Sequence, residues 1–349
     1  MKRLGQLGIL LVLMGSCSLI WGNTQIQTLE VNDSNALNLL NFSQQNKQIW
    51  LKENINSAEW IDNDYPHEKS VLYAKTQVLL SRNFASPGPI DARLNLNTIK
   101  AISAYQIMNG LKVTGKLNQE TWGSLNKERN IEPVFVEYTL TYKDIQQNYV
   151  QSIPTDYADQ AKMQRLHYLR VSEMLAEKFH MDELFLQQIN PKATFEIVGE
   201  KIIVANVKNN LPKGVSYLVA HKGMRQLILF NQENKMIAAF PATIGSEENP
   251  SPTGQYKIVT INKHPFYSYN PKNFIQGNNL KPLLLPPGPN NPVGTVWIGL
   301  SKPSFGIHGT PSPSLISKTY SHGCIRLTNW DVERLASHLQ TGINITFVK

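Results

Sequence analysis

Residues 306–326 read GIHGTPSPSLISKTYSHGCIR, and this stretch decides how the C-terminal part of the chain is interpreted. It collects two histidines, a glycine, a cysteine and an arginine: His308, His322, Gly323, Cys324 and Arg326. The chain has only two cysteines, and the other, Cys17, lies in the apolar N-terminal segment. A single thiol among such neighbours indicates retention for reactivity rather than for packing.

Thiol catalysis requires a base, donors that hold the oxyanion, and a group that fixes the base. Cys324 supplies the thiol, and His308 or His322 lies within the same stretch to serve as base. Gly323 lets the backbone approach a substrate, so the N–H groups of Gly323 and Cys324 can point at one oxygen. Arg326 adds a positive charge that lowers the pKa of the thiol or holds a substrate carboxylate.

A zinc site is the alternative interpretation of the same residues. Two imidazoles and a thiolate are zinc ligands, and water can complete a catalytic site. The spacing through Gly323 favours a backbone turn over chelation, and the chain has no further cysteine there. We therefore expect no metal and no cofactor.

The N-terminus has the pattern of an export signal over residues 1–22. Lys2 and Arg3 precede an apolar run over residues 7–14 that is short for a bilayer span. Cys17 follows Met-Gly-Ser, which resembles a bacterial lipoprotein box and would tether the protein to a membrane. Cleavage near Gly22 is the alternative, and it would leave a free periplasmic protein; an uncleaved membrane anchor is the third outcome. Residues 23–66 are rich in Asn, Gln and Ser and are interpreted as a polar spacer.

The composition is that of a globular protein with several domains. The 349 residues are 41% apolar and 17% charged, with a formal net charge of +8. Lys and Arg are scattered without consecutive basic blocks, so we expect no nucleic-acid partner, whereas an anionic polymer such as a cell wall remains compatible.

The sequence pattern of residues 67–130 predicts a small three-helix domain. Helical spacing marks a first helix around Leu72 and Val78, a second from Thr98 to Met108, and a short third from Asn118 to Leu125. The segment resembles the peptidoglycan-binding domain of the three-helix kind. The matching positions are Ile90-Asp91, Thr98, Ala101, Tyr105-Gln106, Gly110-Leu111, Thr114-Gly115 and Thr121-Trp122. Ala92, Tyr105 and Thr114 depart from the usual Gly, Phe and Asp.

Residues 139–208 predict a small α+β segment. Two helical runs around Leu175 and Leu186 are followed by Asn190-Pro191 and by the strand-like EKIIVANV. This order is loosely similar to a LysM module, a second kind of glycan-binding unit.

Residues 214–349 predict a mainly β catalytic domain of sandwich-like type with one C-terminal helix. β-rich runs alternate with turns, and a Pro-, Gly- and Asn-rich insertion follows Lys263. The helix NWDVERLASHL is expected to use Asn329 as its N-cap.

The pairing of HGT with SHGCIR resembles the active-site signature of L,D-transpeptidases of the YkuD type, and PTGQY after Ser251 agrees with it. The resemblance implies that Cys324 is the nucleophile, that His308 is the general base, and that the carbonyl of Gly309 orients His308. It implies that His322 and Arg326 shape the site and bind substrate, while Ser321 steadies the turn and Gly323 contributes to substrate binding.

The implied reaction is acyl transfer between peptide stems of peptidoglycan, which gives 3→3 cross-links and makes carbapenems expected inhibitors. Water, a lipoprotein lysine or a free D-amino acid could replace the second stem, so a hydrolase and a lipoprotein-attaching or -detaching enzyme remain alternatives. A non-catalytic protein that binds the cell wall is the remaining alternative. The expected partners are peptide stems and glycan strands, and the expected location is the periplasm of a Gram-negative bacterium.

Overall fold

The computed structural model describes residues 50–61, 68–127, 132–246, 250–319, 321 and 323–349. These described residues belong to one compact unit, Asn46–Lys349. The predicted export segment, most of the spacer, and His322 lie outside the described residues. Within the described part of the chain, no helix has the length and apolar character needed to cross a membrane.

The N-terminal region is helical, as predicted. Its helices are α2 (Lys52–Asn56), α3 (Val71–Arg82), α4 (Leu96–Met108) and α5 (Gln119–Leu125). The last three match the three predicted helices, and α2 is an addition within the expected spacer, where it buries Ile55. The side chains of Ser70, Asn95 and Asn118 cap α3, α4 and α5 by accepting a backbone N–H bond. Gly110 follows α4 with φ +67°, the left-handed conformation expected there.

Two buried glutamines organise this region in the same way. The Gln77 Oε1 accepts the N–H groups of Asp91 (3.0 Å) and Ala92 (2.8 Å), and its Nε2 donates to Thr98 Oγ1 (3.0 Å). Gln106 repeats the arrangement one helix later. Its amide bonds the N–H groups of Thr114 and Gly115 and the hydroxyl of Thr121. The two loops are therefore built on one repeated design, which supports both turns from a helix interior.

The repeat also explains a departure from the family pattern. Ala92 has φ +63° where the second loop has Gly115 at φ +67°. Ala92 thus keeps the left-handed turn without glycine, at a steric cost that glycine does not have. The turn geometry is retained although the residue type differs.

The next region has the predicted α+β composition. Strand β1 (Phe135–Thr139) pairs with β2 (Lys201–Ala205) in an antiparallel two-stranded sheet. Four helices lie between them in the chain: α6 (Tyr142–Ile145), α7 (Tyr157–Gln160), α8 (Val171–Lys178) and α9 (Glu183–Ile189). On α9, Phe185, Leu186 and Ile189 are buried, whereas Leu184 is 71% exposed.

The C-terminal region is built on a nine-stranded sheet with the order β5-β4-β3-β13-β7-β10-β11-β12-β6. Its strands are β3 (Tyr217–His221), β4 (Gln226–Phe230), β5 (Met236–Pro241), β6 (Thr243–Ile244), β7 (Gly254–Lys263), β10 (Val296–Leu300), β11 (Gly306–His308), β12 (Ile325–Arg326) and β13 (Asn344–Val348). The edge strands β5 and β6 are separated in the chain by Ala242 alone. The sheet must therefore curve until its two edges meet, which confirms the predicted sandwich-like architecture.

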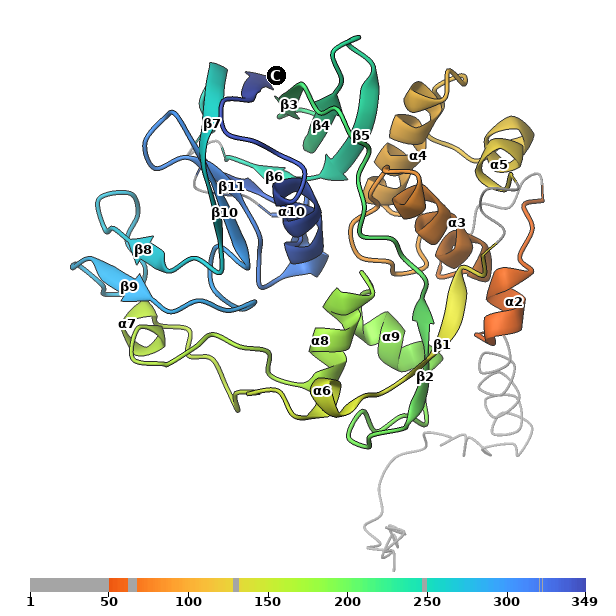
Figure 1. Ribbon diagram of the computed structural model, residues 1–349, viewed down its shortest axis with the longest axis horizontal. Helices are drawn as coiled ribbons and strands as arrows, with labels where there is room; N and C mark the ends of the chain where they lie inside the picture. Colours follow the sequence, from red (N-terminus) through yellow and green to blue (C-terminus); the bar gives the residue numbers. More distant parts are fainter. Residues whose placement is uncertain (1–49, 62–67, 128–131, 247–249, 320, 322) are drawn as a thin grey trace, which may run out of the picture. The chain divides into compact units, whose positions relative to one another are not determined.

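Helix α10 (Asn329–Ala336) and the short hairpin β8 (Tyr267–Tyr269) with β9 (Leu283–Leu285) complete this region (Figure 1). The helix packs on β10 and β11, and Val332 and Leu335 join the buried cluster of the sheet. The N-cap of α10 is Thr328, which accepts the N–H of Asp331, and not Asn329 as predicted. The side chain of Asn329 is used in the site instead.

The helical region and the sheet are joined by buried polar contacts. Ser86 donates to the Asp331 carboxylate (2.7 Å), which also pairs with Arg334 (3.3 Å). The backbone of Ala85 forms a bridge with Ala239 of β5. The ion pair lies within α10, whereas the Ser86 bond and the Ala85 bridge cross the junction and hold the two regions together.

Replacement of Gln77 by leucine should lower the free energy of unfolding by about 3 kcal/mol, because two buried N–H groups lose their acceptor. Gln106→Leu should have a similar effect on the second loop. Urea denaturation followed by circular dichroism measures both changes. The exposed Gln151→Leu serves as control and should leave stability unchanged. Equal stability of all three variants would contradict the repeated design.

Candidate active site

The register of two short parallel strands brings the predicted thiol and imidazole to one face of the sheet. Ile307 of β11 pairs with Ile325 of β12, and His308 pairs with Arg326. Both isoleucines are fully buried in the core. Because side chains alternate along a strand, His308 and Arg326 project from the opposite face, together with Cys324 two residues before Arg326.

Neighbouring strands extend this row. Trp297 of β10 pairs with His308 on one side and with Asn262 of β7 on the other. The indole stacks on the imidazole, with ring centroids 5.6 Å apart and planes inclined by 20°. A Cβ at Gly306 would lie 2.7 Å from the indole, so glycine at this position makes room for the ring. Trp297 thus packs against the face of the His308 ring and limits its movement.

A cavity of about 690 Å³ opens over this face. Cys324, His308, Arg326 and Ser321 line it, so the structure brings four of the predicted site residues to one space. The Pro-rich insertion lines it as well, through Pro265, Phe266 and Tyr267 among others. His264, which begins this loop, is not among the lining residues.

The orientation of His308 follows from one hydrogen bond. Its Nδ1 lies 2.7 Å from the carbonyl oxygen of Gly309. A carbonyl can only accept, so Nδ1 carries the proton and Nε2 keeps a free lone pair. Burial, assisted by the charge of Arg326, lowers the pKa of His308 to about 3 against the opposing effect of the Gly309 bond. The imidazole is therefore neutral near pH 7.

The thiol of Cys324 is neutral at rest as well. Burial raises its pKa and outweighs a backbone hydrogen bond from Gly306 and the charge of Arg326. Arg326 acts in the direction expected from the sequence, but the net shift is upward because desolvation is the larger effect. The Sγ atom lies 3.6 Å from the carbonyl oxygen of Ser304. Because both groups are neutral, no thiolate–imidazolium pair is formed in advance. The proton must pass from the thiol to the imidazole during the reaction.

The turn before Cys324 is fixed by two serines. Ser321 donates to the carbonyl of Cys324 (2.6 Å) and accepts the N–H of Gly245 (2.7 Å). Ser251 donates to the carbonyl of Gly323 (2.8 Å). Gly323 has φ +98°, and a Cβ there would lie 2.7 Å from the ring of Phe305. Glycine is thus required by both conformation and space.

Asn329 holds the loop that carries the Gly309 carbonyl. The sequence does not reveal this role, because the position of Asn329 before a helix predicts a cap. Its Oδ1 accepts the N–H groups of Thr295 and Thr310, both at 3.2 Å. Cβ atoms on Gly294 and Gly309 would lie within 2.2 Å of this oxygen, so both glycines permit its approach. The glycine of the HGT sequence, Gly309, is the signal in the sequence that could have indicated such close packing.

Behind Asn329 lies a buried carboxyl group from the α+β region. Asn329 Nδ2 donates to Glu177 Oε2 (3.0 Å), and the hydroxyl of Tyr168 donates to the same oxygen (3.1 Å). Burial raises the pKa of Glu177 to about 8, although both hydrogen bonds act to lower it. The carboxyl group is thus largely protonated at neutral pH.

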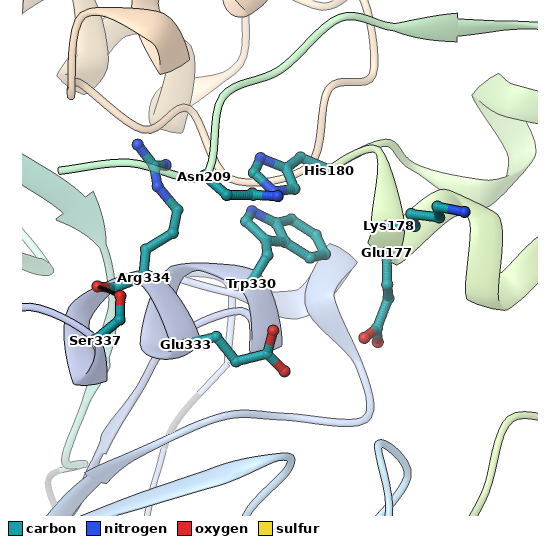
Figure 2. A pocket seen from close by; sticks show the side chains of 8 residues that line it. All are labelled: Glu177, Lys178, His180, Asn209, Trp330, Glu333, Arg334 and Ser337. Carbon is teal, nitrogen blue, oxygen red and sulfur yellow. Dashed lines mark hydrogen bonds between the residues drawn. The ribbon is translucent and has the colours of Figure 1, made fainter. Parts of the chain in front are cut away.

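A second cavity of about 340 Å³ adjoins Glu177 between α8 and α10 (Figure 2). The rings of His180 and Trp330 stack there, with centroids 5.3 Å apart. Burial lowers the pKa of His180 well below its usual range. His180 lies just after the end of α8. No thiol is among the lining residues of this cavity, so it is not the candidate active site.

The described residues contain no group of three His, Cys, Asp or Glu side chains able to hold a metal ion. Cys324 is the free cysteine among them. Cys324, His308, Gly309, Ser321, Gly323 and Arg326 are brought together, whereas His322 lies outside the described residues.

Comparison with known proteins identifies the family. Residues 215–347 match the model of the L,D-transpeptidase catalytic domain, called YkuD, and residues 74–125 match that of a peptidoglycan-binding domain. A protein of Fuscovulum blasticum, named as an L,D-transpeptidase in the ATP synthase subunits region (ORF 5), is 30% identical over 135 residues, which are 39% of this chain and 70% of that protein. The chain belongs to the YkuD family of L,D-transpeptidases.

Further relatives and structures carry the same family name. The protein named L,D-transpeptidase YkuD of Bacillus licheniformis is 29% identical over 50% of this chain and 91% of its own length. The solved L,D-transpeptidase LdtMt1 with imipenem is 16% identical over 43% of this chain and 63% of that chain, with a TM-score of 0.31. L,D-transpeptidase 3 from Mycobacterium tuberculosis is 15% identical over 44% and 66%, with a TM-score of 0.32.

Alkylation of Cys324 by iodoacetamide should accelerate steadily as the pH rises and should not level off by pH 8, because burial raises the thiol pKa. Arg326→Gln should slow alkylation at each pH, since it removes a charge that stabilises the thiolate. A Cys17→Ser background leaves one reactive thiol, and mass spectrometry measures the rate. A plateau below pH 7 would show a preformed thiolate instead.

The unfolding free energy should fall as the pH rises from about 4.5 to about 8, by on the order of 4 kcal/mol from Glu177 alone. In this window the unfolded chain releases the proton that the folded state keeps; below it both states are protonated. Glu177→Gln should remove this contribution, so that its stability relative to wild type increases toward pH 8. The exposed Glu196→Gln is the control, because Glu196 does not act on the pKa of Glu177, and chemical denaturation at several pH values makes the comparison.

Proposed function

We propose that this protein is an exported peptidoglycan L,D-transpeptidase that forms 3→3 cross-links through a thioester on Cys324. The observation that carries this proposal is a neutral imidazole and a single thiol projecting from one sheet face into one cavity. Membership of the YkuD family supports the reaction class. The peptidoglycan-binding region supports the choice of polymer.

The first half-reaction makes the acyl-enzyme. Nε2 of His308 takes the proton of the Cys324 thiol while the sulfur attacks the carbonyl carbon of the third stem residue. The N–H groups of Gly323 and Cys324 hold the oxyanion, which is aided by the left-handed turn at Gly323. The imidazolium then protonates the departing amine of the terminal D-alanine, and a thioester remains.

The second half-reaction regenerates the enzyme. The side-chain amine of another stem attacks the thioester, and His308 takes a proton from this nitrogen and returns it to the sulfur. The carbonyl of Gly309 fills the place that a carboxylate has in other triads, because it keeps the proton on Nδ1 and Nε2 available. Ser321 steadies the turn, and Arg326 and His322 bind substrate in this scheme.

The domain organisation follows from the same proposal. Residues 1–22 direct export, with lipidation of Cys17 as one outcome, and residues 23–66 provide reach from the membrane. Residues 67–130 and the LysM-like residues 139–208 hold the enzyme on glycan strands in the periplasm, and residues 214–349 perform the reaction.

Purified protein incubated with disaccharide-tetrapeptide should yield cross-linked dimers that have lost one D-alanine, detected by mass spectrometry. Cys324→Ala should form none, and His308→Gln should lower the rate by about 10²- to 10⁴-fold, the usual contribution of a general base. His264→Gln is the matched control, because this histidine is exposed and does not line the cavity.

The products decide among the alternatives. Release of tripeptide without dimers would identify a hydrolase, and transfer to a lysine-containing peptide would identify a lipoprotein-attaching enzyme. A carbapenem should add once to the protein and not to Cys324→Ala. No product and no adduct would leave a wall-binding protein and overturn the proposal.

A further inference from the structure

A residue from outside the matched catalytic domain reaches the cavity. Tyr157 opens α7, which precedes residue 215 in the chain, yet it lines the same cavity as Cys324 and His308. Its position is therefore set by how the α7 segment is attached to the catalytic region.

Polar contacts attach this segment to the insertion that carries β8 and β9. The side chain of Gln276 accepts the N–H of Tyr157 (3.0 Å) and donates to the carbonyl of Thr155 (2.8 Å). Asn279 donates to the Asp156 carboxylate at 3.2 Å. Gln276 and Asn279 of the insertion thus hold the turn that begins α7.

Aromatic contacts fix the ring itself. Tyr157 meets three rings edge-on, with interplanar angles of 81–85° and centroid distances of 5.9 Å to Tyr267, 5.4 Å to Tyr269 and 6.4 Å to Phe274. Each edge-to-face pair contributes to stability beyond its buried area. The ring has little freedom, so its hydroxyl group occupies a defined place.

That place is the boundary between two cavities. A smaller cavity of about 290 Å³ adjoins the cavity of Cys324, and Tyr157, Pro292 and Arg326 line both. The smaller one is rich in hydroxyl groups, from Thr243, Thr310, Ser312 and Thr319. A phenol and a guanidinium therefore lie together where the reaction space meets a recess that carries several hydroxyl groups.

The charges suit an anion at this boundary. Burial raises the pKa of Tyr157, so its hydroxyl stays protonated and can donate, although Arg326 acts in the opposite direction. Cys324 lies two residues before Arg326, at most roughly 7 Å away along the chain, and both line the cavity. In a tetrapeptide stem, only the nitrogen and Cα of D-alanine separate the attacked carbonyl from the terminal carboxylate, which matches this short span.

We propose that Tyr157 is a substrate-positioning residue which, with Arg326, binds the terminal carboxylate of the stem that donates the acyl group. This inference rests on the proposed function. It makes the α7 segment part of the active site, so that substrate recognition depends on residues outside the catalytic domain.

Binding to an inactive protein tests the inference without the reaction. Calorimetry with Cys324→Ala should show that a tetrapeptide with a C-terminal carboxamide binds about tenfold more weakly than the free acid, the scale expected for a hydrogen bond to a charged group. Adding Tyr157→Phe, which keeps the ring, should weaken the acid about tenfold and the amide little. Equal weakening of both peptides, or no weakening, would overturn the inference.

Kinetics and a matched variant complete the test. In the active protein, Tyr157→Phe should raise KM for the tetrapeptide about tenfold, with kcat and melting temperature nearly unchanged. Tyr142→Phe, at an exposed tyrosine of α6, should leave all three as in wild type. If wild type forms no product although the carboxylate preference and its loss in Tyr157→Phe are measured, the proposed reaction fails and the binding inference stands.

Discussion

The parallel pairing of β11 with β12 is the constraint on which the site depends. Two residue pairs define it, Ile307 with Ile325 and His308 with Arg326. The buried isoleucines anchor one face in the core, so the reactive side chains must share the other. A register slip of one residue would bury Cys324 and expose an isoleucine to the cavity. Packing of the two isoleucines in the core therefore also keeps the thiol and the imidazole on the cavity face.

The electrostatics of the site are dominated by desolvation. Burial lowers the pKa of His308, raises that of Cys324, and outweighs the charge of Arg326 on the thiol. A pair that is neutral at rest does not hold a thiolate open to oxidation, which suits a protein expected outside the cytoplasm. The same burial requires each polar atom to be bonded, and Asn329 and Ser321 meet this requirement around the reactive pair.

The regions that the sequence divides are packed as one unit. Asp331 of α10 bonds Ser86 of the helical region, Glu177 of α8 bonds Asn329, and Tyr157 of α7 lines the cavity. The regions before residue 215 thus do more than precede the catalytic domain. They supply buried partners to the helix that follows the thiol, and one residue, Tyr157, that lines the reaction space.

The sequence by itself determined the helices around Leu72, Thr98 and Trp122, the mainly β character of the C-terminal region, and the identity of the residues near Cys324. These are local properties: helical spacing, strand propensity, and a motif whose members lie close together in the chain. Only the tertiary structure decided that Asn329 holds the Gly309 loop, that burial reverses the expected pKa of Cys324, and that Tyr157 reaches the cavity. Each of these depends on contacts between residues far apart in the chain, and no local pattern specifies the desolvation or the partners that such contacts create.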